Sequence, residues 1–305
     1  MLEVAIMIEG QNGLNWTRWQ ALARLVEDLG FVGLYRSDHF TNANPPDLAS
    51  LELWVSLTWL ASHTRRIEFG PLVSPVSFRH PAFTARMAAA VDDLSGGRLT
   101  LGMGAGWQER EHTLFGFDLL PPGERFDRFE EGLEVVTRLL RQPQPVDFDG
   151  RYYQLRGASL LPRPLRPGGP PILIGGNGAK RTPDLVARYA DEWNAIFLTP
   201  DGFRAANQRM DAALAAHGRA PQSLRRSMMT GLRFGRTDAD LREKLAARGQ
   251  SVDELRARGL VVGTGSAVRD QLAALAEAGL QRVMLQWLDL DDLTGLEALA
   301  KAVLG

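Results

Sequence analysis

Eight short apolar segments alternate with longer segments of helical periodicity along this chain of 305 residues. Short apolar runs bounded by polar or glycine-rich turns are typical of buried parallel strands, and apolar residues three and four apart are typical of amphipathic helices. The predicted strands are Val4–Ile8, Phe31–Tyr35, Ile67–Val73, Arg98–Met103, Ile172–Ile174, Glu192–Leu198, Met228–Phe234 and Gln281–Leu288. Because a helix follows each of them, the alternation predicts a closed (β/α)8 barrel.

An open doubly wound sheet is the competing fold, since it uses the same alternation. Such a sheet usually has fewer strands and a glycine fingerprint after the first one, but the loop Glu9–Gly13 lacks the GxGxxG spacing. Prolines cluster at about 141–171, where Asp149–Gly150 predicts a small hairpin, and charged helices are predicted at about 238–262. We expect both stretches to be excursions from a single domain covering residues 1–305.

Composition narrows the classes of function. A net charge of −1 gives no electrostatic basis for binding nucleic acid or an acidic membrane surface. The absence of cysteine excludes thiol catalysis, disulfides and cysteine-based zinc sites, and the five histidines form no HExxH motif, so no metal is expected. No apolar run approaches the roughly 20 residues that span a bilayer, and Met1–Ile6 leads directly into a strand. We therefore expect a soluble, cytoplasmic protein with a small-molecule substrate.

Polar side chains follow the second predicted strand, where the apolar run gives way to Ser37, Asp38 and His39. Chemistry in parallel α/β folds collects at the carboxyl ends of strands, and a carboxylate beside an imidazole is suited there to handling a proton or a hydride. A structural interpretation is equally compatible with these residues. In it, Asp38 caps the next helix and His39 is a hydrogen-bonded residue at the rim.

Two further strands end irregularly. The proline in Gly70–Val73 cannot donate a ladder hydrogen bond, so it predicts a bulge that leaves backbone groups free to meet a flat ligand, with a plain strand exit as the alternative. Gly102, Gly104 and Gly106 alternate, which removes side chains from one face of the next strand end. Either a ligand approaches the backbone there or the barrel packs tightly around it.

The fifth predicted strand runs into the glycine-rich turn Gly175–Gly178 and then a helix whose first turn carries Lys180 and Arg181. Cations at a helix N-terminus oppose the helix dipole. A bound anion would remove this conflict, because free backbone N–H groups and the dipole both favour phosphate, whereas a solvated turn is the alternative. Together these segments predict a planar cofactor with its phosphate at this turn and its ring near Leu72 and His39.

Five segments in this order carry a resemblance to a known family: Ser37–Phe40, Leu72–Pro75, Val91–Arg98, Gly104–Trp107 and Gly175–Gly178. The chain resembles the luciferase-like monooxygenase superfamily, and more narrowly its branch of oxidoreductases that use the deazaflavin coenzyme F420. The resemblance covers nearly the whole chain and is weakest over Asp238–Val262. It implies a TIM barrel of the bacterial luciferase type, usually a homodimer, that binds flavin or deazaflavin at the carboxyl-terminal rim.

The resemblance also implies roles for individual residues. His39 would donate or accept a proton beside the cofactor ring, and the turn Gly175–Gly178 would take the phosphate. A cis peptide bond that often backs the ring in this family corresponds here to the Pro71–Leu72 bond. The implied cofactor contacts are Asp38, His39, Pro71, Leu72, Val73, Ala105, Gly106, Gly175, Gly176, Asn177, Gly178, Lys180 and Arg181.

One departure from the family pattern bears on the reaction. Sugar-phosphate dehydrogenases of the F420 branch have a glutamate directly after the glycine that matches Gly106, whereas this chain has Trp107, which is better suited to line an apolar substrate pocket. The resemblance favours an oxidoreductase that transfers hydride between F420 and a small organic substrate. An FMN-dependent monooxygenase is the alternative, because spacing does not separate the two cofactors, and a non-catalytic flavin-binding barrel is a second alternative.

Overall fold

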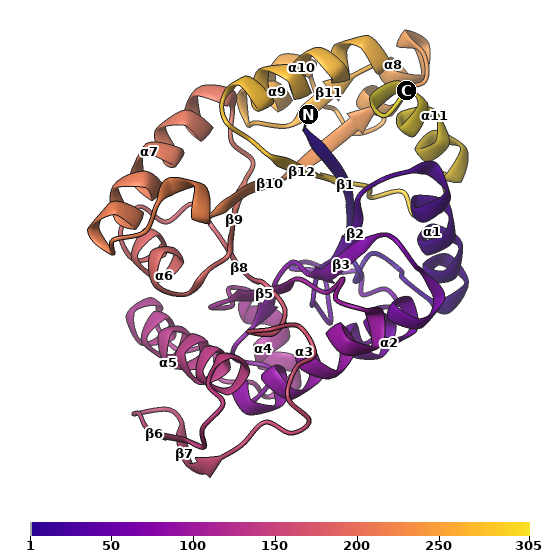
Figure 1. Cartoon of the computed structure of the whole chain (residues 1–305). Helices are drawn as coiled ribbons and strands as arrows, with labels where there is room; N and C mark the ends of the chain where they lie inside the picture. The colour runs from indigo at the N-terminus through magenta and orange to yellow at the C-terminus, as the bar shows by residue number, and fades with distance from the viewer. Residues whose placement is uncertain (1) are drawn as a thin grey trace.

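Parallel strands arranged in a ring form the centre of the molecule (Figure 1), seen in a computed structural model that describes residues 2–305. Neighbouring strands around the ring follow the order β3, β2, β1, β12, β10, β9, β8, β5 and β4. Their bounds are β1 Glu3–Ile8, β2 Gly33–Arg36, β3 Glu68–Pro71, β4 Ser74–Pro75, β5 Leu101–Gly104, β8 Ile172–Gly175, β9 Glu192–Ile196, β10 Arg225–Phe234 and β12 Arg282–Gln286. Each predicted strand overlaps one of these.

The ring closes between β5 and the pair β3 and β4. Phe69 of β3 forms an isolated parallel bridge to Leu99, and Ser74 of β4 pairs with Met103 of β5. Both pieces therefore flank the same neighbour and are two halves of one strand. When they are counted once, the ring in residues 2–305 has eight strands, which confirms the predicted (β/α)8 barrel.

Helices surround this ring in Figure 1. Their bounds are α1 Trp16–Leu29, α2 Leu53–His63, α3 Pro81–Ser95, α5 Pro122–Arg141, α6 Arg181–Tyr189, α7 Pro200–Ala216, α10 Gly265–Glu277 and α11 Leu293–Val303. The first illustrates how local sequence sets these bounds: the Asn15 side chain accepts a hydrogen bond from the Arg18 N–H, and Gly30 ends the helix in the left-handed conformation. Between residues 2 and 305, no helix has the length and apolarity needed to cross a membrane.

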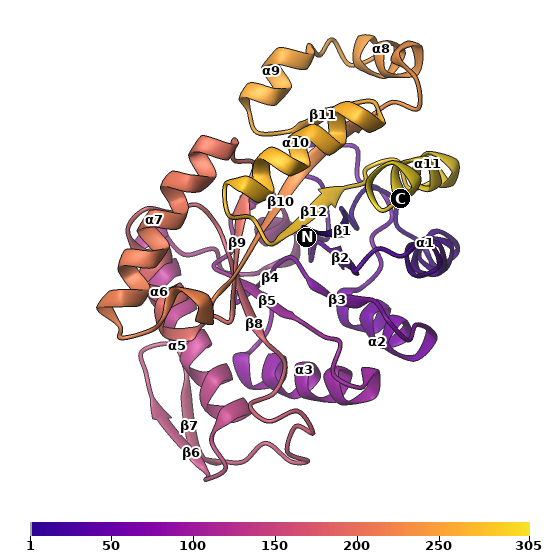
Figure 2. The same ribbon diagram turned by 45° about the horizontal axis from the view of Figure 1, so that its top comes forward.

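Smaller elements lie outside the alternation. The predicted hairpin is confirmed as β6 Val146–Asp149 paired with β7 Gln154–Ala158, and the predicted charged helices are α8 Asp238–Ala246 and α9 Val252–Ala257, which Figure 2 shows standing apart from the barrel. Three elements were not predicted: α4 Glu109–Phe115, the 3-10 turn Pro221–Ser223 and β11 Val261–Gly263, which pairs with β10. Each is too short for periodicity to reveal it.

The predicted irregularity beside Pro71 is a break between β3 and β4 rather than a bulge, and the predicted cis bond is placed one residue too early. The cis peptide bond joins Leu72 and Val73, not Pro71 and Leu72. Pairing with β2 continues through this point, since the Leu72 N–H still donates to the Arg36 carbonyl. The strand therefore breaks only after Leu72.

The alternating glycines of β5 accommodate this break. A Cβ at Gly102 would lie 2.1 Å from the Pro71 carbonyl oxygen, and one at Gly104 would lie 2.6 Å from Val73 Cγ2. At these two positions the glycines serve tight packing between strands, one of the two interpretations left open by the sequence. What approaches the backbone there is the neighbouring strand.

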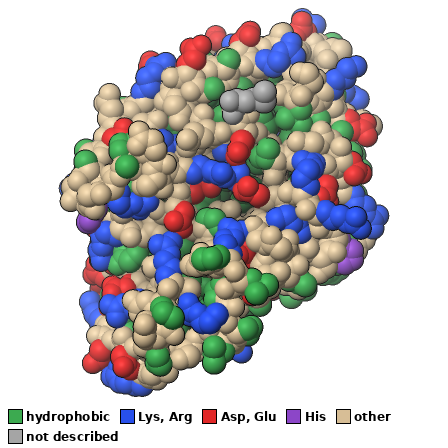
Figure 3. Space-filling view, viewed as in Figure 1, with side chains coloured by type: hydrophobic (Ala, Val, Ile, Leu, Met, Phe, Trp, Pro, Cys, Tyr) green, Lys and Arg blue, Asp and Glu red, His purple; other side chains and the backbone are tan. Residues whose placement is uncertain are grey.

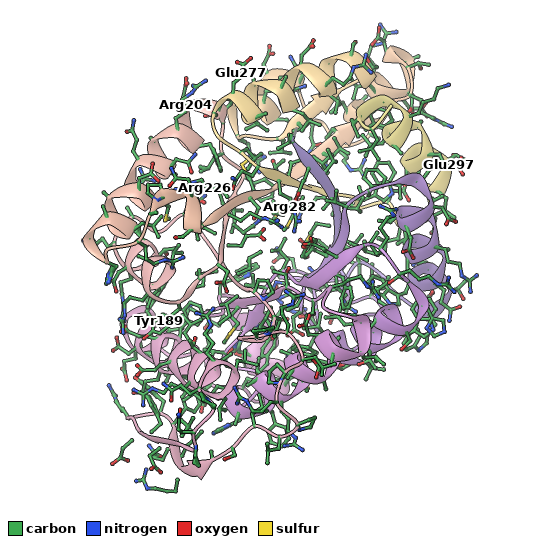
Figure 4. All side chains as sticks on the ribbon, viewed as in Figure 1. Tyr189, Arg204, Arg226, Glu277, Arg282 and Glu297 are labelled. Carbon is green, nitrogen blue, oxygen red and sulfur yellow. The ribbon has the colours of Figure 1, made fainter. Side chains whose placement is uncertain are left out.

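A charge cluster centred on the buried Arg282 lies at the amino-terminal end of the barrel. Arg282 pairs with Glu3 at 2.7 Å and with Glu68 at 2.8 Å, and it donates to the Tyr35 hydroxyl at 2.7 Å. Figure 4 places Arg282 within the ring of strands, and Figure 3 shows acidic and basic side chains together near the middle of the face it views. This cluster also borders a cavity of about 320 Å³ lined by charged groups such as Glu192 and Glu68.

Replacing Gly102 by alanine tests the packing of β5 against the broken strand. Because the new methyl group would collide with backbone, which cannot swing aside, we expect a loss of about 1–3 kcal/mol in the free energy of unfolding. Gly123→Ala is the matched control: its Cβ meets no atom within 4 Å and it lies in α5, so the change should be below about 1 kcal/mol. Denaturant unfolding measures both, and equal stabilities would contradict this packing.

Candidate active site

A cavity of about 610 Å³ lies at the carboxyl-terminal end of the barrel, a volume typical of cofactor and substrate sites. Residues that follow β1, β2, β5, β8 and β9 meet there, together with side chains from α4 and α5. The lining consists of Met7, Glu9, Ser37, His39, Leu72, Val73, Pro75, Gly104, Ala105, Gly106, Trp107, Glu111, His112, Arg125, Phe126, Gly175, Asn194, Ile196, Phe197, Met229 and Gln286.

The predicted site residues divide into two groups. Those that line the cavity are His39, Leu72, Val73, Ala105, Gly106, Trp107 and Gly175. Those outside its lining are Asp38, Pro71, Gly176, Asn177, Gly178, Lys180 and Arg181. The expectation that the imidazole after the second barrel strand and the turn after β8 share one rim agrees with this geometry.

His39 is held by a residue that sequence reasoning missed. Its Nδ1 lies 2.7 Å from Oε1 of Glu111, a carboxylate of α4 that is almost completely buried. The second oxygen of Glu111 accepts a hydrogen bond of 3.0 Å from the Phe40 N–H. Glu111 thus fixes both the ring and the backbone beside it, and it leaves Nε2 of His39 as the nitrogen available to a molecule in the cavity.

This contact controls the charge of His39. Burial alone lowers the pKa of the imidazole, but the hydrogen bond to Glu111 and the charge of that carboxylate outweigh it, so the pKa is raised above its ordinary value. The stability that the pair contributes is therefore complete below the ordinary pKa of histidine and is lost as the pH rises through the raised one. At pH values between the ordinary pKa of histidine and the raised pKa of His39, the imidazole is mainly protonated in the folded protein and mainly neutral in the unfolded one.

Asp38 has a different role from its neighbour. It is buried, and its carboxylate accepts a hydrogen bond of 2.7 Å from Ser74 Oγ and forms an ion pair with Arg79. Burial raises the pKa of Asp38, and the Arg79 guanidinium opposes that shift. The alternative in which Asp38 caps the next helix is wrong, because the N-cap of α2 is Glu52. Asp38 links the residues that follow β2 to Ser74 of β4, the piece of strand that comes after the break.

The turn after β8 is partly satisfied by the protein itself. The Gly176 N–H donates to the Asn194 carbonyl at 2.9 Å. The Asn177 amide both donates to and accepts from the backbone of Ile196, at 2.6 and 2.9 Å. These hydrogen bonds attach the turn to β9 and fix its backbone conformation. The assignment of Gly176 and Asn177 as cofactor contacts stays a prediction.

The two cations near this turn are not equivalent. Arg181 forms ion pairs with Asp127 at 2.6 Å and with Glu130 at 3.0 Å, both on α5. The exposed Lys180 side chain makes no ion pair or hydrogen bond within residues 2–305. The conflict between these cations and the helix dipole is thus relieved in part by carboxylates of α5, a possibility that local sequence did not reveal.

A third cation does line the cavity. Among the described lining residues, Arg125 is the only arginine or lysine. Its guanidinium donates to the carbonyls of Gly106 at 3.1 Å and Leu120 at 2.9 Å, so it lies against the end of β5. Arg125 was missed because it belongs to an ordinary charged helix turn and only the fold brings it to the rim.

A cavity at the carboxyl end of a parallel barrel, with an imidazole and an arginine in its wall, lies where (β/α)8-barrel enzymes have their active sites. Residues 3–252 match the family described as luciferase-like monooxygenase. The chain therefore belongs to the luciferase-like monooxygenase family, and the resemblance seen in the sequence is confirmed.

Individual relatives differ in the chemistry they are named for. The chain is 32% identical over 213 residues to the 5,10-methylenetetrahydromethanopterin reductase of Archaeoglobus fulgidus, a match that covers 70% of this chain and 59% of that relative's length. Its fold matches an F420-dependent secondary alcohol dehydrogenase in complex with an F420-acetone adduct, with a TM-score of 0.85, 17% identity, and coverage of 99% and 98% of the two chains. It also matches a riboflavin lyase with modified FMN and riboflavin, with a TM-score of 0.82, 17% identity, and coverage of 100% and 90%.

The Glu111 contact makes a prediction about His39. Glu111→Gln should lower the pKa of the imidazole, because a neutral amide no longer favours the charged ring while burial persists. Glu109→Gln, on the exposed side of the same helix, is the control and should leave that pKa where it is. Titration of the His39 ring signals by NMR reads out both variants. An unchanged titration in the Glu111 variant would show that the carboxylate does not set the charge.

Proposed function

We propose that this protein transfers hydride between coenzyme F420 and a small organic substrate, with His39 moving the accompanying proton. The observation that carries the proposal is the His39–Glu111 pair at the wall of the cavity, 2.7 Å apart. A carbonyl or imine that takes up a hydride also needs a proton, and a positioned imidazolium whose pKa is raised by a neighbouring carboxylate can supply one.

The residues present fit a flat cofactor with an anionic tail. Gly106 and Gly175 bring bare backbone to the cavity, and a Cβ at Gly176 would meet no atom within 4 Å, so the turn has room for a ligand. Arg125, together with Lys180 and Arg181, would hold the tail. Leu72 and Val73 would back the ring. F420, when bound, supplies hydride transfer, and a flavin in the same place would allow chemistry with oxygen.

The chain's own residues then have separate tasks. Glu111 orients His39 and keeps it protonated, while Nε2 faces the molecule to be protonated or deprotonated. Asp38, through Ser74 and Arg79, fixes the distance between that imidazole and the broken strand. Trp107 covers His39 and forms part of the substrate side of the cavity.

The choice of F420 over FMN draws its support from relatives. The 32% identical relative is named a methylenetetrahydromethanopterin reductase, and a structure with F420 shares the fold over 98% of its length. An FMN-dependent monooxygenase remains the second candidate, because the riboflavin lyase with modified FMN has the same fold.

Binding and turnover together test the proposed function. We expect F420 to bind with micromolar or better affinity in a fluorescence titration, and FMN to bind more weakly. His39→Asn should lower the turnover number by about 10²–10⁴-fold while leaving F420 affinity nearly unchanged, because only the proton transfer is removed. Tighter binding of FMN than of F420 would overturn the choice of cofactor. Unchanged turnover in the His39 variant would instead favour a non-catalytic barrel or another acid.

The proposed binding of the anionic tail can be tested by removing the three cations of the protein that would hold it. The double variant Lys180→Ala, Arg181→Ala and the single variant Arg125→Ala should each weaken F420 binding, with a loss that shrinks as salt is raised, since screening weakens charge attraction. We expect Arg125→Ala to have the larger effect because Arg181 is already paired with α5 carboxylates. Arg209→Ala, an exposed arginine on α7, is the control. Unaltered affinity in the double variant would refute the assignment of Lys180 and Arg181.

A further inference from the structure

We infer that the substrate is an extended and largely apolar molecule, with its reacting end at His39 and its body crossing Trp107 into a groove on α4. This inference rests on the proposed function, because it takes His39 as the group that meets the reacting atom. It adds the substrate class and a second specificity-determining residue, Leu114.

The first step is the position of Trp107. Its ring centroid lies 5.5 Å from that of His39, edge to face at 81°, and 63% of the side chain is exposed. A substrate atom that exchanges a proton with His39 must come within about 3 Å of the imidazole nitrogen. Such a substrate therefore touches the indole as well. A large exposed indole at this point favours a flat or apolar group over an anionic one.

The second step is the groove beside it. A second hollow of about 500 Å³, more open than the first, is lined by Trp107, Ala43, Thr113 and Leu114, among other residues. Trp107 lines both hollows, so one side chain separates the candidate active site from the groove. Leu114 is 57% exposed, so its side chain is available to an apolar ligand in the groove. A molecule longer than the inner cavity would cross the indole to reach the groove.

Two donors that line the groove, Arg110 and Gln108, are already occupied, and the groove also carries the exposed carboxylate of Glu109. Arg110 forms a two-pronged ion pair with Asp47, at 2.6 and 2.7 Å, and also donates to the Asn42 carbonyl. The Gln108 amide donates to the Thr41 carbonyl at 2.9 Å. Since these donors are used within the protein, they do not recruit an anion. The groove offers a ligand mainly apolar contact.

The groove is also firmly held. His112 of α4 is buried, with Nδ1 2.7 Å from the Gln108 carbonyl and Nε2 2.8 Å from Ser77 Oγ. Glu111, one residue earlier, is bonded to His39 and Phe40. These contacts join α4 to two neighbouring loops and preform the surface, which reduces the ordering that binding would require.

The experiment measures binding of methyl ketones of increasing alkyl chain length, beginning with butanone, by calorimetry on the intact protein without cofactor. Affinity should rise by up to about fourfold for each methylene that reaches the apolar surface. Leu114→Asp should weaken binding of the long ketones by roughly tenfold and leave butanone unaffected, because butanone does not reach α4. Leu94→Asp, an equally exposed leucine on α3, is the matched control and should change neither.

Equal affinity across the series, no binding of the long ketones, or a Leu114→Asp variant that binds them as the wild type does would overturn the inference. F420 titration of the same samples separates this result from the proposed function. Intact F420 binding with no dependence on chain length would refute the groove alone, whereas failure to bind F420 would count against the cofactor assignment.

Discussion

The packing of the broken strand β3–β4 against β5 is the constraint on which the rest of this structure depends. Gly102 and Gly104 carry no side chains, so the Pro71 carbonyl and the Val73 side chain can lie directly on the neighbouring strand. The barrel closes there in spite of an irregular backbone. Because the strand is interrupted between β3 and β4, Leu72 and Val73 line the cavity. In an unbroken strand, these residues would have continued the backbone pairing with β5.

The same break determines how the His39 imidazole is placed. Asp38 at the end of β2 holds Ser74 just beyond the interruption, and Arg79 completes the link. His39 is the next residue, so its position relative to Leu72 and Val73 is fixed by a buried ion pair. Sites built on strands in this way are more precise than sites on free loops. Glu111 then adds the charge control that the strand itself does not provide.

The two ends of the barrel divide structural and chemical tasks. At the amino-terminal end, the buried Arg282 gathers the carboxylates of Glu3 and Glu68 and the hydroxyl of Tyr35 in a cluster. At the carboxyl-terminal end, the strands leave an open cavity, which Gly104 at the end of β5 and Gly175 at the end of β8 border with bare backbone. This division is general for (β/α)8 barrels, in which stability residues lie below and chemistry lies above.

Periodicity was enough to predict the eight strands and their helices, because each apolar pattern is complete within a short segment, as in Phe31–Tyr35 and Trp16–Leu29. It was also enough to place His39 and Gly175 on one rim, since both follow barrel strands. Glu111 was beyond its reach: the residue is 72 positions from His39 and lies on a helix of seven residues. The ion pairs of Arg181 were hidden for the same reason, since Asp127 and Glu130 belong to another helix. Contacts that only the fold creates leave no local pattern.

The central claim is that one cavity joins a redox cofactor to the His39 imidazole at the broken strand. A crystal structure of the protein with F420 tests it most directly. The account predicts the deazaflavin ring against Leu72 and Val73, the phosphate beside Gly175 and Arg125, and His39 Nε2 facing the space next to the ring. A ring bound elsewhere, or bound with its phosphate toward His39, would contradict the account.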